Sequence, residues 1–343
     1  MGVVKLGDVA RESRLKWTKS KQDVPIVGLE HLIPDEIRFD AYDINTDNTF
    51  SKRFVKGQVL FGRRRAYQRK AAIAEFDGIC SGDITVIQAI EGKMVPELLP
   101  FIIQTPVFFD YANRGSAGSL SPRVKWEHLA DYEFELPPLE EQKILADKLW
   151  AAYRLKEAYK KLLVATDEMV KSQFIEMFGG LCQDTPWSDV VTITNGKAYP
   201  EEYQEEGAYP ICGSGGIMCY GEKKLCNGNT TILGRKGNIN NPIFMESGYW
   251  IVDTAFSIDV DKAKLHPKFF YYWCCQYDFT KLNKQGVLPS LARKDLEKVK
   301  MAIPQMRDQL KFVSIAEQAD KSKFELKQCI EHIDKVIKSL ING

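Results

Sequence analysis

The sequence predicts an α+β protein: two pseudo-two-fold related mixed α/β domains, joined and separated by two long antiparallel coiled-coil helices. Three observations predict this class. The chain contains an internal repeat, each copy ends in a long stretch of helix-forming residues, and the second stretch carries a heptad pattern. With 343 residues and 44% hydrophobic content, the chain can bury two separate cores.

The repeat is visible as residues that recur at a constant offset. One set recurs 167 positions later: Pro122, Leu129, Pro137, Glu141 and Gln142 match Pro289, Leu296, Pro304, Asp308 and Gln309. Upstream, residues 60–64 match 232–236 at an offset of 172, and residues 81–86 match 253–258 at the same offset. Two copies of one unit are expected to fold alike and to be related by a pseudo-two-fold axis.

Composition sets the expected boundaries along the chain. They are 1–138 for the first domain, 139–180 for the first helical region, 181–304 for the second domain and 305–343 for the second helical region. In the first domain, short β-rich runs between turn signals predict strands at 24–28, 58–62, 71–74 and 84–87. A helix is expected after Pro96, and Pro267 leads the matching stretch.

The two helical regions have clear limits. Residues 139–178 contain no Gly or Pro, with Pro137-Pro138 before them and Gly179-Gly180 after them. The second helix is expected to run from Pro304 to the chain end. About 35 helical residues make a rod of about 50 Å, longer than a small domain needs, so the two helices are expected to pair with each other.

A heptad pattern predicts which helix residues pair. In the second helix, Phe312, Ala319, Leu326, Ile333 and Leu340 are seven apart, and Ile315, Ser322, Cys329 and Val336 interleave with them. The same register in the first helix includes Leu155, Tyr159, Leu162 and Met169. Leu149, Leu163 and Val170 form another apolar stripe, which indicates more than one partner surface.

The sequence gives little support for a metalloprotein, a nucleotide-binding enzyme, a methyltransferase or a membrane protein. The eight cysteines and four histidines match no metal or catalytic spacing, and residues 213–216 (Gly-Ser-Gly-Gly) lack the Walker pattern, so a turn is expected there. Residues 241–244 (Asn-Pro-Ile-Phe) resemble an adenine-methyltransferase motif but lack its second Pro, and they predict a strand start. No apolar run is long enough to span a membrane, and a cytoplasmic location is expected.

Four stretches together resemble one known family. They are residues 136–142 (Leu-Pro-Pro-Leu-Glu-Glu-Gln), 209–217 (Tyr-Pro-Ile-Cys-Gly-Ser-Gly-Gly-Ile), 232–237 (Ile-Leu-Gly-Arg-Lys-Gly) and 252–256 (Val-Asp-Thr-Ala-Phe). In this order, inside a duplication, they resemble the specificity subunit of type I restriction-modification systems over essentially the whole chain. The sequence differs from many relatives at Arg63-Arg64-Arg65, where they have a Ser/Gly-rich loop.

The resemblance implies a DNA-binding subunit without catalytic activity. Each globular segment would be a target recognition domain for one half of a split, asymmetric site in double-stranded DNA. The conserved helices would form the spacer and carry two adenine-methyltransferase subunits, with restriction subunits in the full complex. The chain would need no cofactor, since S-adenosylmethionine would bind the methyltransferase. The alternative is a non-catalytic coiled-coil adaptor whose duplicated domains bind protein.

Basic loops predict where DNA would bind. The net charge is only +1, yet residues 51–70 hold eight basic residues and no acid. Arg suits guanine and phosphate, and Asn suits adenine. The candidates in the first domain are Arg63, Arg64, Arg65, Tyr67, Arg69, Lys70, Arg114 and Arg123. Those in the second are Arg235, Lys236, Asn238, Asn240, Lys284 and Arg293. An adaptor would not need basic loops at matching places in both copies.

Overall fold

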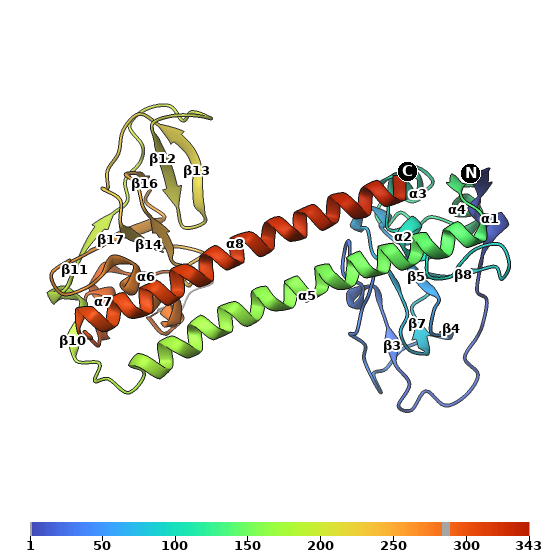
Figure 1. The fold of residues 1–343 in the computed structure, drawn as a ribbon, viewed down its shortest axis with the longest axis horizontal. Helices are drawn as coiled ribbons and strands as arrows, with labels where there is room; N and C mark the ends of the chain where they lie inside the picture. Colours follow the sequence, from blue (N-terminus) through green and yellow to red (C-terminus); the bar gives the residue numbers. More distant parts are fainter. Residues whose placement is uncertain (1, 283–288, 343) are drawn as a thin grey trace. The chain divides into compact units, whose positions relative to one another are not determined.

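The computed structural model describes residues 2–282 and 289–342, which form two compact units (Figure 1). Unit 1 comprises Met1–Ala158 and Cys329–Gly343, and unit 2 comprises Tyr159–Gln328. Each unit therefore contains a globular part and a portion of each long helix, α5 (Leu139–Phe178) and α8 (Met306–Asn342). The boundaries expected from sequence place the two helices outside the domains instead.

Unit 1 is built around two small sheets. The first has the order β2-β8-β5-β6 and is antiparallel throughout (Ala10–Glu12, Ile84–Ala89, Val59–Gly62, Ala71–Ile73). The second has the order β3-β7-β4 (Ile26–Val27, Gly78–Cys80, Lys52–Phe54). Strand β1 (Gly2–Lys5) pairs with β9 (Glu133–Leu136), directly before α5. All four residues of β5 are buried, which explains its uninterrupted apolar sequence.

Short helices complete unit 1. They are α1 (Leu6–Val9), η1 (Leu29–His31), η2 (Ala66–Gln68), α2 (Leu99–Ile103), α3 (Pro106–Arg114) and α4 (Trp126–Ala130). Helix α3 begins at a side-chain cap, because the Thr105 side chain accepts a hydrogen bond from the backbone N–H of Phe108 and Pro106 occupies the first turn. The four strands predicted in this segment and the helix after Pro96 are confirmed.

Unit 2 repeats the plan. Its four-stranded sheet has the order β11-β17-β14-β15 (Val191–Asn195, Ala255–Val260, Thr230–Gly234, Ile243–Met245). A three-stranded sheet follows the order β13-β12-β16 (Gly216–Gly221, Tyr209–Gly213, Trp250–Ile251), and β10 (Thr185–Pro186) pairs with β18 (Lys300–Met301). The helices are η3 (Trp187–Asp189), α6 (Pro267–Gln276), η4 (Phe279–Leu282) and α7 (Arg293–Leu296).

The predicted turn at 213–216 is confirmed as the tip of the β12–β13 hairpin, where Gly216 has a positive φ of 108°. The predicted strand start before Ile243 is also confirmed. One predicted equivalence is wrong by one residue. Gly62 pairs with Ile84 in unit 1, and Gly234 pairs with Ala255 in unit 2. Strand β8 therefore matches β17 at an offset of 171 rather than 172, since pairing register, not similarity of letters, fixes which residues correspond.

The long helices pair within each unit and run antiparallel. In unit 1, Lys156 Nζ lies 2.7 Å from Asp334 Oδ1, and in unit 2, Lys323 Nζ lies 2.7 Å from Asp167 Oδ1. Lys323 lies 167 residues after Lys156, and Asp167 lies 167 residues before Asp334, so the two ion pairs are equivalent under the repeat. Phe312, fully buried, also contacts the rings of Phe174 and Phe178 on α5.

Part of the predicted pairing face is wrong. Leu155, Leu162 and Met169 are 45%, 49% and 48% exposed. The predicted register places the second inward line three residues after the line of Phe312, but the structure places it four residues after. The inward residues of this second line are Leu149, Lys156, Leu163 and Val170 on α5, and Ala316, Lys323, Ile330 and Ile337 on α8. Lys156 and Lys323 interrupt the inward stripe, and Lys148 interrupts the outer stripe of α5, so apolar content does not distinguish the two faces. Ile333 is buried, and Tyr159, Leu326 and Leu340 are half-buried.

Two buried glutamines fix the start of each long helix. Gln142 Oε1 accepts a 2.9 Å hydrogen bond from Val95 N, and its Nε2 donates to the Pro137 carbonyl at 2.9 Å. Gln309 makes the equivalent bonds with His266 N and the Pro304 carbonyl, both at 2.8 Å. Among the helices that the structure describes, none is long and apolar enough to cross a bilayer.

Candidate nucleic-acid interface

The basic loop of unit 1 follows β5 and is held by main-chain bonds. Arg63 N donates to the Asp83 carbonyl at 2.9 Å, and Arg65 N donates to the Pro122 carbonyl at 2.8 Å. Between them, Arg64 forms a β-bridge with Arg123. The loop at 63–69 and the segment at 117–123 are therefore one continuous surface, although the sequence separates them by about 50 residues.

Asp83 organises the charges of this surface. Its carboxylate accepts a 2.7 Å hydrogen bond from Arg123 Nε and a 3.3 Å bond from Arg64 Nη1. Partial burial raises the pKa of Asp83, but the bonds from Arg123 and then Arg64 outweigh it, so the pKa lies below its usual value. Arg64 Nη2 also donates to Ser121 Oγ at 2.9 Å, which fixes the guanidinium at both ends.

The other predicted residues of the loop have different surroundings. Arg69 forms an ion pair with Asp35 (Nε to Oδ1, 2.8 Å) and lies over the Phe109 ring. Lys70 Nζ donates a hydrogen bond to the Leu29 carbonyl at 2.7 Å, so this side chain contributes to the structure of unit 1. Tyr67 is 57% exposed at the surface. Arg114 lies nearby at the end of α3, its Nε 3.4 Å from the Asp110 carbonyl.

Unit 2 holds its loop in the same way. Arg235 N donates to the Thr254 carbonyl at 2.7 Å, and Gly237 N donates to the Pro289 carbonyl at 3.0 Å. Lys236 forms a β-bridge with Ser290. These bonds repeat the contacts of Arg63, Arg65 and Arg64, and they join a basic loop to the segment before a short helix in both copies.

The remaining candidates of unit 2 are placed unequally. Asn238 is exposed, whereas Asn240 uses its Oδ1 to accept a 2.8 Å bond from Phe279 N. Arg293 is exposed and forms an ion pair with Glu297 (Nε to Oε1, 2.7 Å). Lys284 lies outside the described residues.

Sequence reasoning missed two further basic residues in unit 1, Arg14 and Lys16. An open groove of about 580 Å³ is lined by Arg14, Lys16 and Lys52 and continues to Asp83. Arg14 is 79% exposed, and its nearest carboxylate, that of Glu12, is 3.8 Å away. The alternating basic residues at 14 and 16 were the available signal. They lie so far from residues 63–70 in sequence that only the fold reveals the shared surface.

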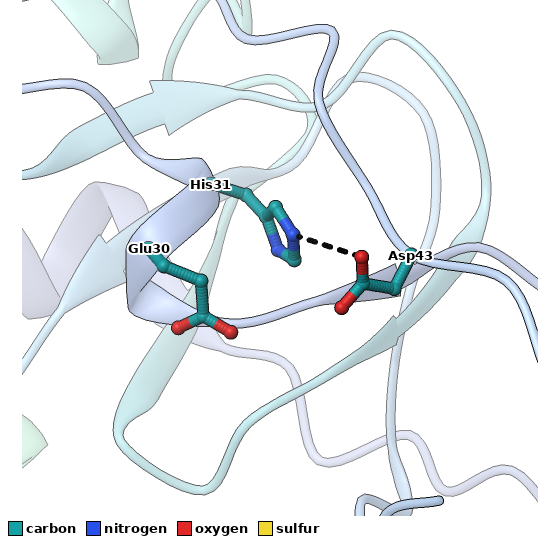
Figure 2. Close-up of side chains that lie close together, drawn as sticks. All are labelled: Glu30, His31 and Asp43. Atoms are coloured by element: carbon teal, nitrogen blue, oxygen red, sulfur yellow. Dashed lines mark ion pairs between the residues drawn. The ribbon is translucent and has the colours of Figure 1, made fainter. Parts of the chain in front are cut away.

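Glu30, His31 and Asp43 form the one group of potential metal ligands among residues 2–282 and 289–342 (Figure 2). His31 Nδ1 accepts a 2.9 Å hydrogen bond from Gly28 N, so the neutral ring carries its proton on Nε2. That atom faces Asp43 Oδ1 at 3.7 Å and has no lone pair for a metal. Asp43 also forms two backbone hydrogen bonds with Ile26. The group is best explained as a structural contact that holds the segments around residues 26–31 and 43 together.

One family model matches both copies of the repeat. The family model for the type I restriction modification DNA specificity domain matches residues 1–163 and again 183–335. The chain belongs to this family. The specificity subunit of the type I restriction enzyme EcoDI from Escherichia coli is 32% identical over 89 residues, which span 26% of this chain and 19% of that relative.

Two solved structures share the fold of this specificity-family chain. The type I restriction-modification S subunit from M. genitalium has a TM-score of 0.67 at 12% identity, covering 99% of this chain and 95% of that one. A chain from a structure on complex assembly and conformational transition of the type I R-M system has a TM-score of 0.59 at 17% identity, covering 99% and 96%. At these identities the likeness concerns the fold.

Proposed function

We propose that this chain is the DNA-specificity subunit of a type I restriction-modification complex and has no catalytic activity of its own. Each unit reads one half of a bipartite site in double-stranded DNA through its paired loops. The observation that carries the proposal is the repeated bonding of Arg63–Arg65 to residues 122–124 and of Arg235–Gly237 to residues 289–291. Both arrangements present Arg or Lys from fixed backbone, as phosphate and base-edge contacts require.

The long helices dock two adenine-methyltransferase subunits. Exposed apolar side chains at seven-residue spacing on α5 support this role: Leu155, Leu162 and Met169. Such residues, left unused by the helix pair, indicate a protein-binding surface. S-adenosylmethionine binds the methyltransferase, so this chain needs no cofactor. The methylating complex acts in the cytoplasm, and where the system includes restriction subunits, they join this complex.

The alternative, a protein-binding adaptor, accounts for the exposed stripe on α5. It gives no role to basic loops held identically in both units. DNA binding explains both features with one assembly, and we favour it for that reason.

The test uses the purified full chain with random duplex DNA at several salt concentrations. Wild type should bind with a steep salt dependence and select a split sequence. Arg235→Ala combined with Lys236→Ala should lower the affinity and reduce the salt slope by about 1 to 2. Lys338→Ala, an exposed basic residue on α8, is the matched control and should change neither. Equal binding by all three proteins would contradict the proposal. Incubation of the chain alone with DNA and labelled S-adenosylmethionine should transfer no methyl group.

A further inference from the structure

Arg65 has an unusual backbone conformation for an arginine. Its φ is 54°, in the left-handed region, where it precedes η2. The residue with the same main-chain bond in unit 2 is Gly237, with φ 76°. Glycine adopts this conformation freely, whereas a Cβ makes it unfavourable. Unit 1 therefore keeps a bulky residue where unit 2 shows that glycine suffices for the turn.

The folded chain itself gives Arg65 no compensating bond. Arg64 is held by Asp83 and Ser121, and Arg69, also left-handed at φ 55°, is held by Asp35 and Phe109. Within the described part of the chain, the Arg65 guanidinium has neither a hydrogen bond nor an ion pair. A strained residue whose side chain is unused in the free protein is typical of a ligand-binding position.

The surroundings place this side chain on the candidate interface. Arg65 N is bonded to the Pro122 carbonyl, so its backbone is fixed between the basic loop and the segment that carries Arg123. The neighbouring Asp83 is already occupied by two guanidinium groups. The Arg65 guanidinium therefore remains available for an outside acceptor.

We infer that Arg65 is a specificity-determining residue of unit 1, and that its guanidinium reads a guanine in the half-site of that unit through the O6 and N7 atoms. This inference rests on the proposed DNA recognition. Arginine fits guanine because its two parallel N–H donors match the two acceptors in the major groove. Unit 2 has Gly237 at this place and must read its half-site with other residues.

The experiment compares wild type, Arg65→Gly, Arg65→Lys and the control Lys338→Ala, each as the full chain. Bound sequences are selected from a random duplex pool, and thermal unfolding is measured on the same samples. Arg65→Gly should lose the preference for one guanine in one half-site, with discrimination at that position falling about 5- to 150-fold, while the other half-site is unchanged. Its Tm should rise, by up to roughly 2–4 °C, because relief of backbone strain outweighs the added chain entropy of glycine.

Arg65→Lys separates charge from geometry. It should keep the salt dependence of binding but lose the guanine preference, since an ammonium group cannot form the bidentate contact. Full retention of the guanine preference in Arg65→Gly, or a lower Tm in that variant, would overturn the inference while leaving the proposed function standing. A wild-type chain without any sequence preference would overturn both.

Discussion

Asp83 and Arg123 are joined by a 2.7 Å hydrogen bond between Oδ1 and Nε, across 40 residues of sequence. This bond ties the strand β8 side of the interface to the segment before α4. Because Arg64 binds the same carboxylate, the Asp83 side chain fixes two arginine side chains that lie on different loops. Asp83 thereby positions the cations that we propose face DNA.

Asp83→Asn should weaken specific DNA binding without abolishing the fold. A neutral amide cannot hold two guanidinium groups, so Arg64 and Arg123 lose their fixed orientation. We expect specific affinity to fall by about 5- to 20-fold, equivalent to roughly 1–2 kcal/mol. Fluorescence anisotropy with the selected duplex measures this change. Asp77→Asn, which alters an exposed acid paired with Arg53 at 3.5 Å, is the control and should bind like wild type.

Asp83 should also make the free energy of unfolding depend on pH in the acidic range. Its pKa in the folded chain lies below the value of about 3.9 expected when unfolded. The unfolded chain therefore takes up more protons near pH 4, and the contribution of Asp83 to the free energy of unfolding is lost as the pH falls through this range. At pH 7 wild type should exceed Asp83→Asn by about 1 kcal/mol, and the difference should shrink below about pH 4. A difference that stays constant to pH 3 would contradict this role.

Gln142→Met and Gln309→Met should each destabilise one unit. Either change leaves a backbone N–H and a carbonyl without their buried partners, at a cost of about 1–3 kcal/mol. Hydrogen exchange should show faster opening at Val95 in the first variant and at His266 in the second. Gln318→Met, at an exposed position on α8, should leave exchange unchanged. Unaltered exchange in both core variants would show that the glutamine bonds contribute little.

The two faces of the long helices should respond differently to a charge. Ile333→Asp places a carboxylate at a buried position and should lower stability by several kcal/mol. Leu162→Asp, at an exposed position, should change stability by less than about 0.5 kcal/mol but reduce co-purification with the methyltransferase. Val164→Asp alters a residue that is 59% exposed outside that stripe and should leave the complex intact. Full complex formation by Leu162→Asp would exclude the stripe as the docking surface.

The fold was predictable from the sequence where a sequence pattern is compatible with only one kind of structure. Residues 139–178 contain no helix breaker and form a helix over that whole span. The spacing of Gln142 and Gln309 marked the repeat, but their buried hydrogen bonds depend on loops that no local pattern places. The sequence marked Leu149, Leu163 and Val170 as a second apolar stripe but did not single it out as the inward face, because Lys156 and Lys323 occupy that face as ion-paired residues.

The candidate interface was predicted only in part. A run of basic residues marked 63–70, yet the structure uses Lys70 and Arg69 within the fold and leaves Arg65 available. Arg14 and Lys16 join the surface through strand pairing, a long-range contact without a local signal. The left-handed backbone of Arg65 has no signal in its own residue type, and its φ of 54° is seen only in the structure.

Methylome sequencing of a host carrying the methyltransferase with and without this chain tests the central claim most directly. Adenine methylation should appear at a split, asymmetric motif only when the chain is present. Replacing residues 1–138 with the domain of a relative should change one half of that motif and preserve the other. Methylation that is independent of the chain, or a domain exchange that changes both halves, would contradict the account.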